Sequence, residues 1–520
     1  MATEVRTPRT GSAHRGSFSS RKVFILAAIG SAVGLGNIWR FPYVAYENGG
    51  GAFILPYLVA LLTAGLPFLL LDYALGHRNR GSAPLSFART HRRTEWIGWW
   101  QVGICFVIAV YYAAVIAWAV RYTGFSVSKA WGDAPDEFLF GTFLQAGDPG
   151  VSLDVVPGVL VPLAVVWLAV LVVMSLGVQK GIGATAVVFI PVLILAFGAL
   201  VVRALFLPGA GIGLDALFRP DWAALTQTSV WAAAFGQIFF SLSVGFGIMI
   251  TYSSYVGRRT DMTGSGLVVG FANSGFELLA GIGVFAALGF MAQAQGVAVD
   301  EVASDGLGLA FVAFPAIINE APAGALIGVL FFGSLVFAGV TSLVSVIEVV
   351  ISAVRDKFEM TRLGATLTVV LPSAVVSLVF FSTTSGVYVL DIVDHFINRY
   401  GILLVAVVSM VAVAWFARAL GPLAAHLNRT GSVPLGRWWT VLIAAVTPAA
   451  LTVVLVRELV ADLASPYEGY PAWMLGLFGW GIAAVVLALA GAAMLVRWRA
   501  STSLTPPDDD PAEHTAEVAR

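Results

Sequence analysis

The chain has 520 residues, of which 58% are hydrophobic and only 11% are charged. A soluble protein carries roughly 25% charged residues, so this composition excludes an ordinary soluble domain and indicates a membrane protein. The net charge of -1 leaves no basic excess for binding nucleic acid. The single cysteine, Cys105, excludes an intrachain disulfide.

Apolar runs long enough to cross a bilayer, which takes about 20 residues, recur along nearly the whole chain. Residues 1–21 precede them and contain four arginines, and we interpret them as a cytoplasmic segment because no cleavage site follows. Residues 501–520 are rich in proline and acid and are expected to be disordered. The expected spans are 22–47, 52–77, 96–129, 157–177, 180–205, 229–257, 264–292, 324–356, 364–382, 386–417, 438–460 and 472–497.

The distribution of Lys and Arg among the short loops predicts which side of the membrane each loop faces. Basic residues follow the second, sixth, eighth and tenth spans, whereas the loop 131–157 is acidic and contains no Lys or Arg. Both termini are therefore expected in the cytoplasm. That arrangement requires an even number of spans, and twelve satisfies it.

Two pairs of glycines lie in the middle of membrane spans. Gly34 and Gly36 belong to the first span, and Gly245 and Gly247 to the sixth. Such pairs weaken a helix, although close packing of helices is an alternative explanation. The two pairs occupy matching positions in two halves of five spans, which have opposite orientations because five is odd. Paired interruptions of this kind indicate the binding site of a transporter.

Several segments around these glycines closely resemble the neurotransmitter:sodium symporter family, and in particular its bacterial LeuT-like amino-acid transporters. The segments that carry the resemblance are residues 30–42, 47–53, 236–247, 311–315 and 338–342. The similarity extends from about Arg15 to the tenth span.

The resemblance implies an all-α polytopic membrane protein with a LeuT-like 5+5 inverted repeat and about twelve transmembrane helices. Helices 1 and 6 would be unwound at mid-membrane. The transport core would occupy residues 22–417, and residues 418–500 would add spans 11 and 12.

The resemblance also implies two sites for transported sodium ions and no organic cofactor. The first site would be formed by Ala32, Asn37, Ser241 and Asn273. The second would be formed by Gly30, Val33, Ala338, Thr341 and Ser342. An unwound helix exposes carbonyl oxygens, which are the ligands that hard cations prefer. For the hydroxyl groups, a hydrogen bond to a carbonyl of their own helix is the alternative explanation.

By the same resemblance, the substrate carboxylate would meet the N–H groups of Leu35 and Gly36 and the hydroxyl of Tyr112. The full set of substrate-binding candidates is Ala32, Leu35, Gly36, Ile108, Tyr112, Phe240, Ser241, Ser243, Phe246, Ser342 and Val346. The side-chain pocket is mostly apolar, so a neutral aliphatic or aromatic amino acid is expected. Family members that carry monoamines have an Asp at the position of Gly34, which favours amino acids over amines here.

Glu277 lies one helical turn beyond Asn273 in the seventh span. A carboxylate in a bilayer is costly unless it is paired or protonated. Animal members of the family have a Ser at this position and need chloride, so the resemblance implies that this chain does not. A further hypothesis is that Glu277 is protonated when the site empties and thereby carries protons outward.

Two charged pairs match the gates of the family. Arg40 and Asp394 correspond to the outer gate, and Arg15 and Asp356 to the inner gate. Phe18 matches an aromatic latch at the inner gate, with Tyr255 as its neighbour. Arg399 departs from the family pattern, and the sequence leaves open whether it extends to the membrane surface or lines the outer vestibule.

Together these features predict a secondary active transporter that couples inward sodium movement to uptake of a neutral, hydrophobic amino acid by alternating access. A transporter-shaped sensor that binds without transport is the alternative. No nucleotide-binding motif or catalytic cluster is present in the sequence, so neither an ATP-driven pump nor an enzyme is expected. The expected location is a prokaryotic inner membrane, with the lipid bilayer and the amino acid as partners and no nucleic acid. The sequence predicts no oligomeric state.

Overall fold

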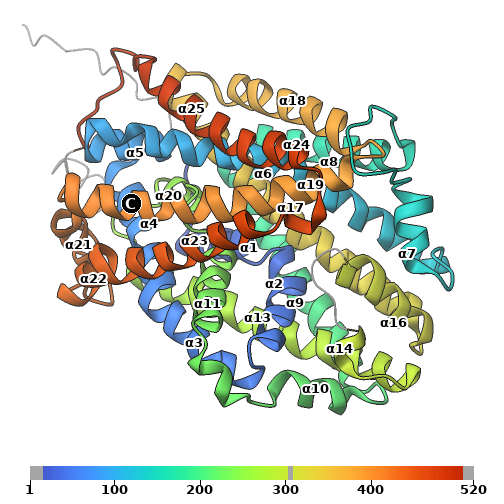
Figure 1. Cartoon of the computed structure of the whole chain (residues 1–520). Helices are drawn as coiled ribbons and strands as arrows, with labels where there is room; N and C mark the ends of the chain where they lie inside the picture. The colour runs from blue at the N-terminus through green and yellow to red at the C-terminus, as the bar shows by residue number, and fades with distance from the viewer. Residues whose placement is uncertain (1–15, 303–307, 508–520) are drawn as a thin grey trace, which may run out of the picture.

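The computed structural model describes residues 16–302 and 308–507. Within these ranges the chain folds into helices without a β-strand, and its only strand-like pairings are two isolated bridges (Figure 1). The predicted all-α class is therefore confirmed.

Ten continuous helical segments of the described residues are long and apolar enough to cross a membrane. They are Gly51–Asn79, Arg92–Ser128, Pro157–Ser175, Val178–Leu205, Met262–Gln295, Gly324–Phe358, Arg362–Phe381, Gly386–Phe416, Arg437–Gly469 and Ala472–Leu495. Each corresponds to one predicted span, and the ends differ by at most four residues, except that the segment Arg437–Gly469 extends nine residues beyond the predicted end at 460. The predicted third span, for example, was 96–129.

Two further spans are interrupted, as the glycine pairs predicted. Helix α1 (Arg21–Ala32) ends before Val33, and α2 (Leu35–Glu47) begins after Gly34. Helix α11 (Thr228–Ser241) and α12 (Ile248–Ser253) are separated by six residues. Counting each interrupted pair as one span raises the number from ten to twelve among the described residues.

The second break depends on three residues with positive φ. Gly245 and Gly247 have φ of +88° and +87°, and Ser243 has φ of +52°. L-residues rarely adopt this region, so glycine at two of the three positions lets the chain leave the helix there. In the first break, Val33 takes an extended conformation instead.

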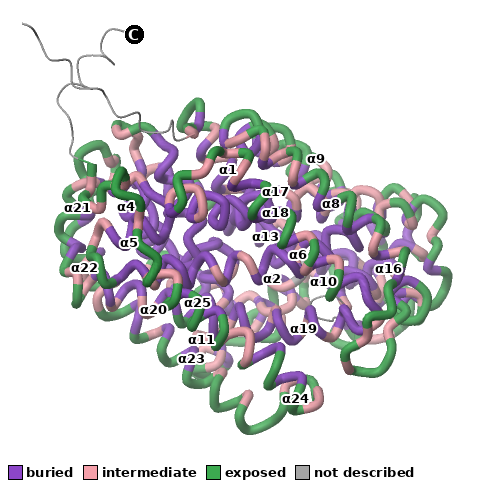
Figure 2. The backbone as a smooth tube through the Cα atoms, turned by 90° about the horizontal axis from the view of Figure 1, so that it is seen from above, coloured by how far each residue is buried: buried purple, intermediate pink, exposed green. Residues whose placement is uncertain are grey.

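The central helices are the most deeply buried (Figure 2). The third span contains α6 (Glu95–Ser128), and 78% of its most apolar 18-residue stretch is buried. In the twelfth span, which contains α25 (Ile482–Leu495), the corresponding share is 22%. Helix α6 packs along α17 (Gly324–Phe358) in the middle of the bundle. The outer helices therefore leave their apolar side chains facing the space that lipid would occupy.

The second span and the sixth are in direct backbone contact. Gly76 of α4 (Leu66–Asn79) packs against α12, and a β-carbon at this position would overlap the carbonyl oxygen of Ile250. No residue other than glycine allows this approach without displacing backbone.

Short helices in the loops were not predicted. Helix α5 (Ala83–Thr90) follows α4, and α10 (Ala210–Phe218) packs on α13 (Met262–Gln295). Helix α21 (Leu420–Asn428) lies between the tenth and eleventh spans and contacts α4. None of the three contains an apolar run long enough to be recognised as a span.

Candidate substrate and ion site

The two helix breaks and α17 meet at the carbonyl groups that end α1. The Ser243 hydroxyl donates to the carbonyl oxygen of Ser31 at 2.9 Å. The Ser342 hydroxyl lies 3.3 Å from the same oxygen and 3.4 Å from that of Gly30. On the other side of the break, the Asn37 side chain accepts the N–H of Gly34 at 2.8 Å and so caps α2. The ends of two half-helices thus face one buried space.

This space is a cavity of about 80 Å³ that contains most of the predicted substrate residues. Ten of the eleven candidates line it, and the exception is Ser241. Seven residues of its lining were not predicted as substrate contacts, and they are Ser31, Gly34, Asn37, Tyr111, Asp394, Asn398 and Ile402. Asp394, which was predicted only for the outer gate, therefore reaches the edge of the same cavity.

The polar end of the cavity lies at the start of α2. The N–H of Leu35 donates to the Tyr112 hydroxyl at 3.3 Å. A β-carbon on Gly36 would overlap the ring of Phe240, so this glycine is what lets the ring cover the start of the helix. An N-terminus with exposed N–H groups favours anions, and a carboxylate is an anion of suitable size. The predicted role of these residues as carboxylate ligands stays a prediction.

The side chains assigned to the first sodium site form one hydrogen-bonded chain across three helices. The Asn37 amide donates to Asn273 at 2.9 Å, and the Asn273 amide donates to the Ser241 hydroxyl at 2.6 Å. All three side chains are buried. This explains why Ser241 is absent from the cavity lining, since its hydroxyl turns towards α13. The oxygens expected to bind sodium are thus gathered in one place, each engaged with a neighbouring donor.

Thr341, assigned to the second sodium site, bonds to its own helix. Its hydroxyl lies 2.9 Å from the carbonyl oxygen of Ala338 and 3.1 Å from that of Phe337. This is the alternative that the sequence left open for such hydroxyls. The two readings are compatible, because a hydroxyl that donates its proton keeps lone pairs for a cation. A β-carbon on Gly30 would lie 3.3 Å from the Thr341 Cβ, so α1 and α17 are close enough to share an ion.

Glu277 is fully buried, and both of its oxygens accept hydrogen bonds. The Gln237 amide donates to one oxygen at 2.6 Å, and the Tyr57 hydroxyl donates to the other. The Tyr57 oxygen also lies 2.8 Å from the Ser274 hydroxyl. Neither Tyr57 nor Gln237 was predicted to take part in the site. A Gln within an apolar run was the one available signal, since a buried amide needs a polar partner.

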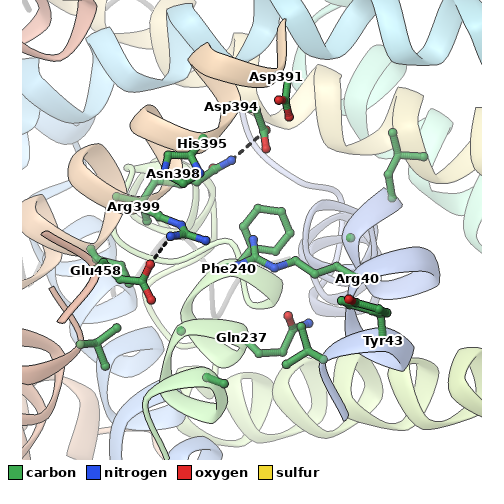
Figure 3. A pocket seen from close by; sticks show the side chains of 18 of the residues that line it. Arg40, Tyr43, Gln237, Phe240, Asp391, Asp394, His395, Asn398, Arg399 and Glu458 are labelled. Carbon is green, nitrogen blue, oxygen red and sulfur yellow. Dashed lines mark hydrogen bonds and ion pairs between the residues drawn. The ribbon is translucent and has the colours of Figure 1, made fainter. Parts of the chain in front are cut away.

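A second cavity, of about 410 Å³, adjoins the first, and Phe240 and Asp394 line both (Figure 3). We name it the outer cavity because the two residues predicted for the outer gate line it. Arg40 lines it, with its guanidinium 4.5 Å from the centre of the Phe240 ring. Asp394 also lines it and accepts a hydrogen bond from Asn398 at 2.8 Å. The two predicted outer-gate residues therefore border one cavity, while an ion pair between them stays a prediction.

The structure decides the question that the sequence left open for Arg399. This side chain lines the outer cavity and forms an ion pair with Glu458 of α23 (Thr447–Ala464) (Figure 3). Four residues before Arg399, His395 contacts Asp462 of the same helix at 2.8 Å. Residues of the eleventh span thus contribute to the vestibule, which was not predicted.

Phe18, which precedes α1, is buried against the end of the sixth span. Its N–H donates to the carbonyl oxygen of Tyr255 at 3.1 Å, and its ring packs on Tyr252 and Tyr255. The predicted neighbours Phe18 and Tyr255 are therefore together. Asp356 accepts the N–H of Ser82 at 2.8 Å. Arg15, its predicted inner-gate partner, lies outside the described residues, so that pairing stays a prediction.

A helical membrane protein whose two discontinuous helices meet at a buried midplane cavity has the construction of a secondary transporter. Comparison with known proteins agrees. The model of the sodium:neurotransmitter symporter family matches residues 15–142 and 131–501. The chain therefore belongs to the sodium:neurotransmitter symporter family, whose members are transporters and not enzymes.

Individual relatives cover most of the chain. An uncharacterized sodium-dependent transporter of Methanocaldococcus jannaschii is 41% identical over 88% of this chain and 93% of its own length. A sodium- and chloride-dependent GABA transporter 2 of Macaca fascicularis is 32% identical over 78% of this chain and 73% of its own. A sodium-dependent dopamine transporter of Bos taurus is 31% identical over 90% and 73%, respectively.

Proposed function

We propose that this transporter couples the inward movement of two sodium ions to uptake of a neutral, hydrophobic amino acid. The observation that carries the proposal is the composition of the smaller cavity. One end offers the N-terminus of α2 and the Tyr112 hydroxyl, which suit a carboxylate, and the other end is apolar, with Ile108, Phe246 and Val346. A neutral amino acid has both of these parts.

The absence of an acid at Gly34 supports an amino acid over an amine. A β-carbon at this position would lie 3.1 Å from the Ser342 hydroxyl and 3.3 Å from that of Tyr112, so an Asp there would place its carboxylate at the cavity. With glycine, an amine without a carboxylate gains no negative partner at this position, and it brings no carboxylate oxygen of its own to the first sodium site. Dopamine has no carboxylate, so we do not propose the substrate of the dopamine-transporter relative for this chain.

The proposal includes independence from chloride. Glu277 supplies a negative charge beside the first sodium site, and Tyr57 and Gln237 already donate to it. A chloride ion would compete for the same two donors. A proton taken up by Glu277 after the sodium leaves would keep the emptied site neutral, which adds proton counter-transport to the proposed cycle.

The proposed cycle is alternating access in a prokaryotic inner membrane with both termini in the cytoplasm. Spans 1, 2, 6 and 7 rock against the remaining spans of a core at residues 22–417, with Arg40 and Asp394 closing the outer side and Arg15 and Asp356 the inner side. The 410 Å³ cavity on one side and the packed Phe18 on the other correspond to an outward-facing stage of such a cycle.

Uptake of radiolabelled amino acids into proteoliposomes tests this function. The purified protein is given an inward sodium gradient, with chloride replaced by gluconate. We expect concentrative uptake of a neutral, hydrophobic amino acid that disappears when potassium replaces sodium. Sodium-dependent binding without uptake would instead establish the sensor alternative, and no binding across the panel would contradict the substrate class.

A further inference from the structure

The chain after α25 folds back across the end of the molecule that carries the basic loops. Residues 498–507, which we name the C-terminal strap, run beside α5 (Figure 1). The strap begins with Trp498, whose ring centre lies 4.3 Å from the ammonium of Lys357. Lys357 is itself buried and paired with Glu95 at 2.6 Å. The start of the strap is therefore held by a cation–π contact with a buried, paired lysine.

The middle of the strap binds the end of α17. The hydroxyls of Ser501 and Thr502 both donate to one carboxylate oxygen of Glu359, the latter at 3.2 Å. Glu359 ends the helix in the left-handed region, with φ of +53°. Hydrogen bonds to a charged acceptor are stronger than those between neutral groups, so this contact joins the strap to the eighth span.

The far half of the strap binds different elements. Arg89 of α5 donates from Nε to the carbonyl oxygen of Ser503 at 3.0 Å. Its Nη1 donates to the carbonyl oxygens of Asn79, at 2.5 Å, and Arg80, at 3.2 Å, at the end of α4. One guanidinium therefore holds the strap and the second span together.

The last described residue, Pro507, reaches the connection between α12 and α13, where its carbonyl oxygen accepts from Arg258 at 3.4 Å. The carbonyl oxygen of Val256 accepts from Arg80, and that of Tyr255 accepts the N–H of Phe18. The amino-terminal segment and the strap thus hold neighbouring residues at the end of the sixth span.

These contacts divide between the two parts of the proposed cycle. Glu359 and Lys357 belong to the eighth span, which stays with the scaffold, whereas Asn79, Arg80 and Arg258 belong to or adjoin spans 2, 6 and 7, which move. We propose that the C-terminal strap is an intramolecular brake, which holds the cytoplasmic side closed until it detaches from the moving spans. This inference rests on the alternating-access part of the proposed function.

The strap acts at high effective concentration because it is tethered to the protein. Each hydrogen bond that it adds across the two parts shifts the closed-to-open equilibrium by about fivefold. Its loss therefore raises the population of the state that is open to the cytoplasm, and amides near the contacts exchange hydrogen faster.

Hydrogen–deuterium exchange of the purified protein in lipid nanodiscs with sodium tests the brake. One variant lacks residues 501–520, and a matched variant lacks only residues 508–520. We expect exchange at residues 252–259 and 79–90 to rise roughly five- to twentyfold in the longer truncation and to stay near the wild-type rate in the shorter one. Unchanged protection in the longer truncation, or the full effect in the shorter one, would overturn the proposal.

A charge swap tests the same contact in the full-length chain. Ser501→Asp places a carboxylate against Glu359 and is expected to raise exchange, whereas Ser501→Ala raises it less. Adding Glu359→Lys to Ser501→Asp restores an attractive pair and is expected to restore protection. Exchange that stays raised in the double variant would contradict the contact. These readouts need neither substrate nor transport, so they are independent of whether the proposed substrate class is right.

Discussion

The proposed independence from chloride rests on one buried side chain, Glu277. Its carboxylate is enclosed by α13, α11 and the second span, and each oxygen has a hydrogen-bond donor from a different helix. The donors Tyr57 and Gln237 would lose their acceptor if the carboxylate were removed. Buried donors without an acceptor cost about 1–3 kcal/mol each, and an anion from solution can remove that cost.

Replacing Glu277 with Ser is therefore expected to make uptake depend on chloride. Without chloride, the variant leaves two donors unsatisfied and the first sodium site without a nearby negative charge, so uptake in gluconate falls by roughly tenfold or more. Chloride restores it. The control is Ser274→Ala, which removes a neighbouring hydroxyl but no charge. Equal uptake of Glu277→Ser in both salts would refute the assigned role.

Thr341→Val is expected to weaken sodium activation of uptake by roughly tenfold, because a buried ligand oxygen is replaced by a methyl group of similar size. Ser334→Ala is the matched control. Ser334 lies two turns earlier on α17, and its hydroxyl also bonds to its own helix, at 2.6 Å from the Leu330 oxygen. The sodium concentration for half-maximal uptake measures both. If this sodium concentration is the same for the two variants, the Thr341 hydroxyl only forms hydrogen bonds within its own helix and does not bind sodium.

Individual site residues were predicted best from the sequence where they belong to a contiguous motif. Ten of the eleven substrate candidates line one cavity because they flank the glycine pairs or face them from α6 and α17. Tyr57 and Gln237 were missed, since each stands alone in an apolar run and their proximity exists only after the helices pack. For the same reason the Arg399–Glu458 pair, 59 residues apart in the chain, could not be predicted.

Among the elements, the two helix breaks differ in construction. In the first break, the chain leaves the helix through Val33 in an extended conformation. In the second break, Ser243, Gly245 and Gly247 all have positive φ. The glycine pairs made both breaks predictable. The loop helices α5 and α21 were not predicted because short helices are stabilised by packing against the spans rather than by a periodic apolar run.

Gly247→Ala is expected to destabilise the second break by about 1–3 kcal/mol, the usual cost of an L-residue in a sparsely populated conformation. Its β-carbon would also lie 3.0 Å from that of Ala83 and 3.2 Å from the Gln101 oxygen. We expect a lower thermal unfolding temperature in detergent and impaired uptake.

Gly275→Ala provides the comparison for this prediction. Gly275 lies in the middle of α13, and a β-carbon there meets nothing within 4 Å. Alanine in a helix is favoured over glycine by up to about 1 kcal/mol, so this variant should be as stable as the parent or more so. Equal stability of Gly247→Ala and Gly275→Ala would mean that the break does not require glycine.

For the molecule as a whole, the sequence predicted twelve spans and their order but not the conformational stage. Every stage of an alternating-access cycle contains the same residues and nearly the same helices. The stage is visible only in how the ends pack, with a 410 Å³ cavity beside Arg40 and a buried Phe18 at the other end. No pattern in the chain distinguishes these arrangements.

The only cysteine in the sequence can report the stage directly. The Cys105 thiol is fully buried in this structure and contacts the carbonyl oxygen of Phe246 at 3.0 Å. We expect it to react with a maleimide slowly in sodium and at least roughly tenfold faster when potassium replaces sodium, since the break around Phe246 then rearranges. Cys105→Ser provides the background. Equal rates in both salts would contradict this movement.

The glycine contact between α4 and α12 limits how the moving part can deform. With the Gly76 backbone directly against Ile250, no layer of side chains exists that could repack as one helix slides on the other. We therefore expect the second span and the inner half of the sixth to move together as one rigid unit. A crosslink between these two helices should leave turnover intact, whereas one from either helix to α17 should stop it.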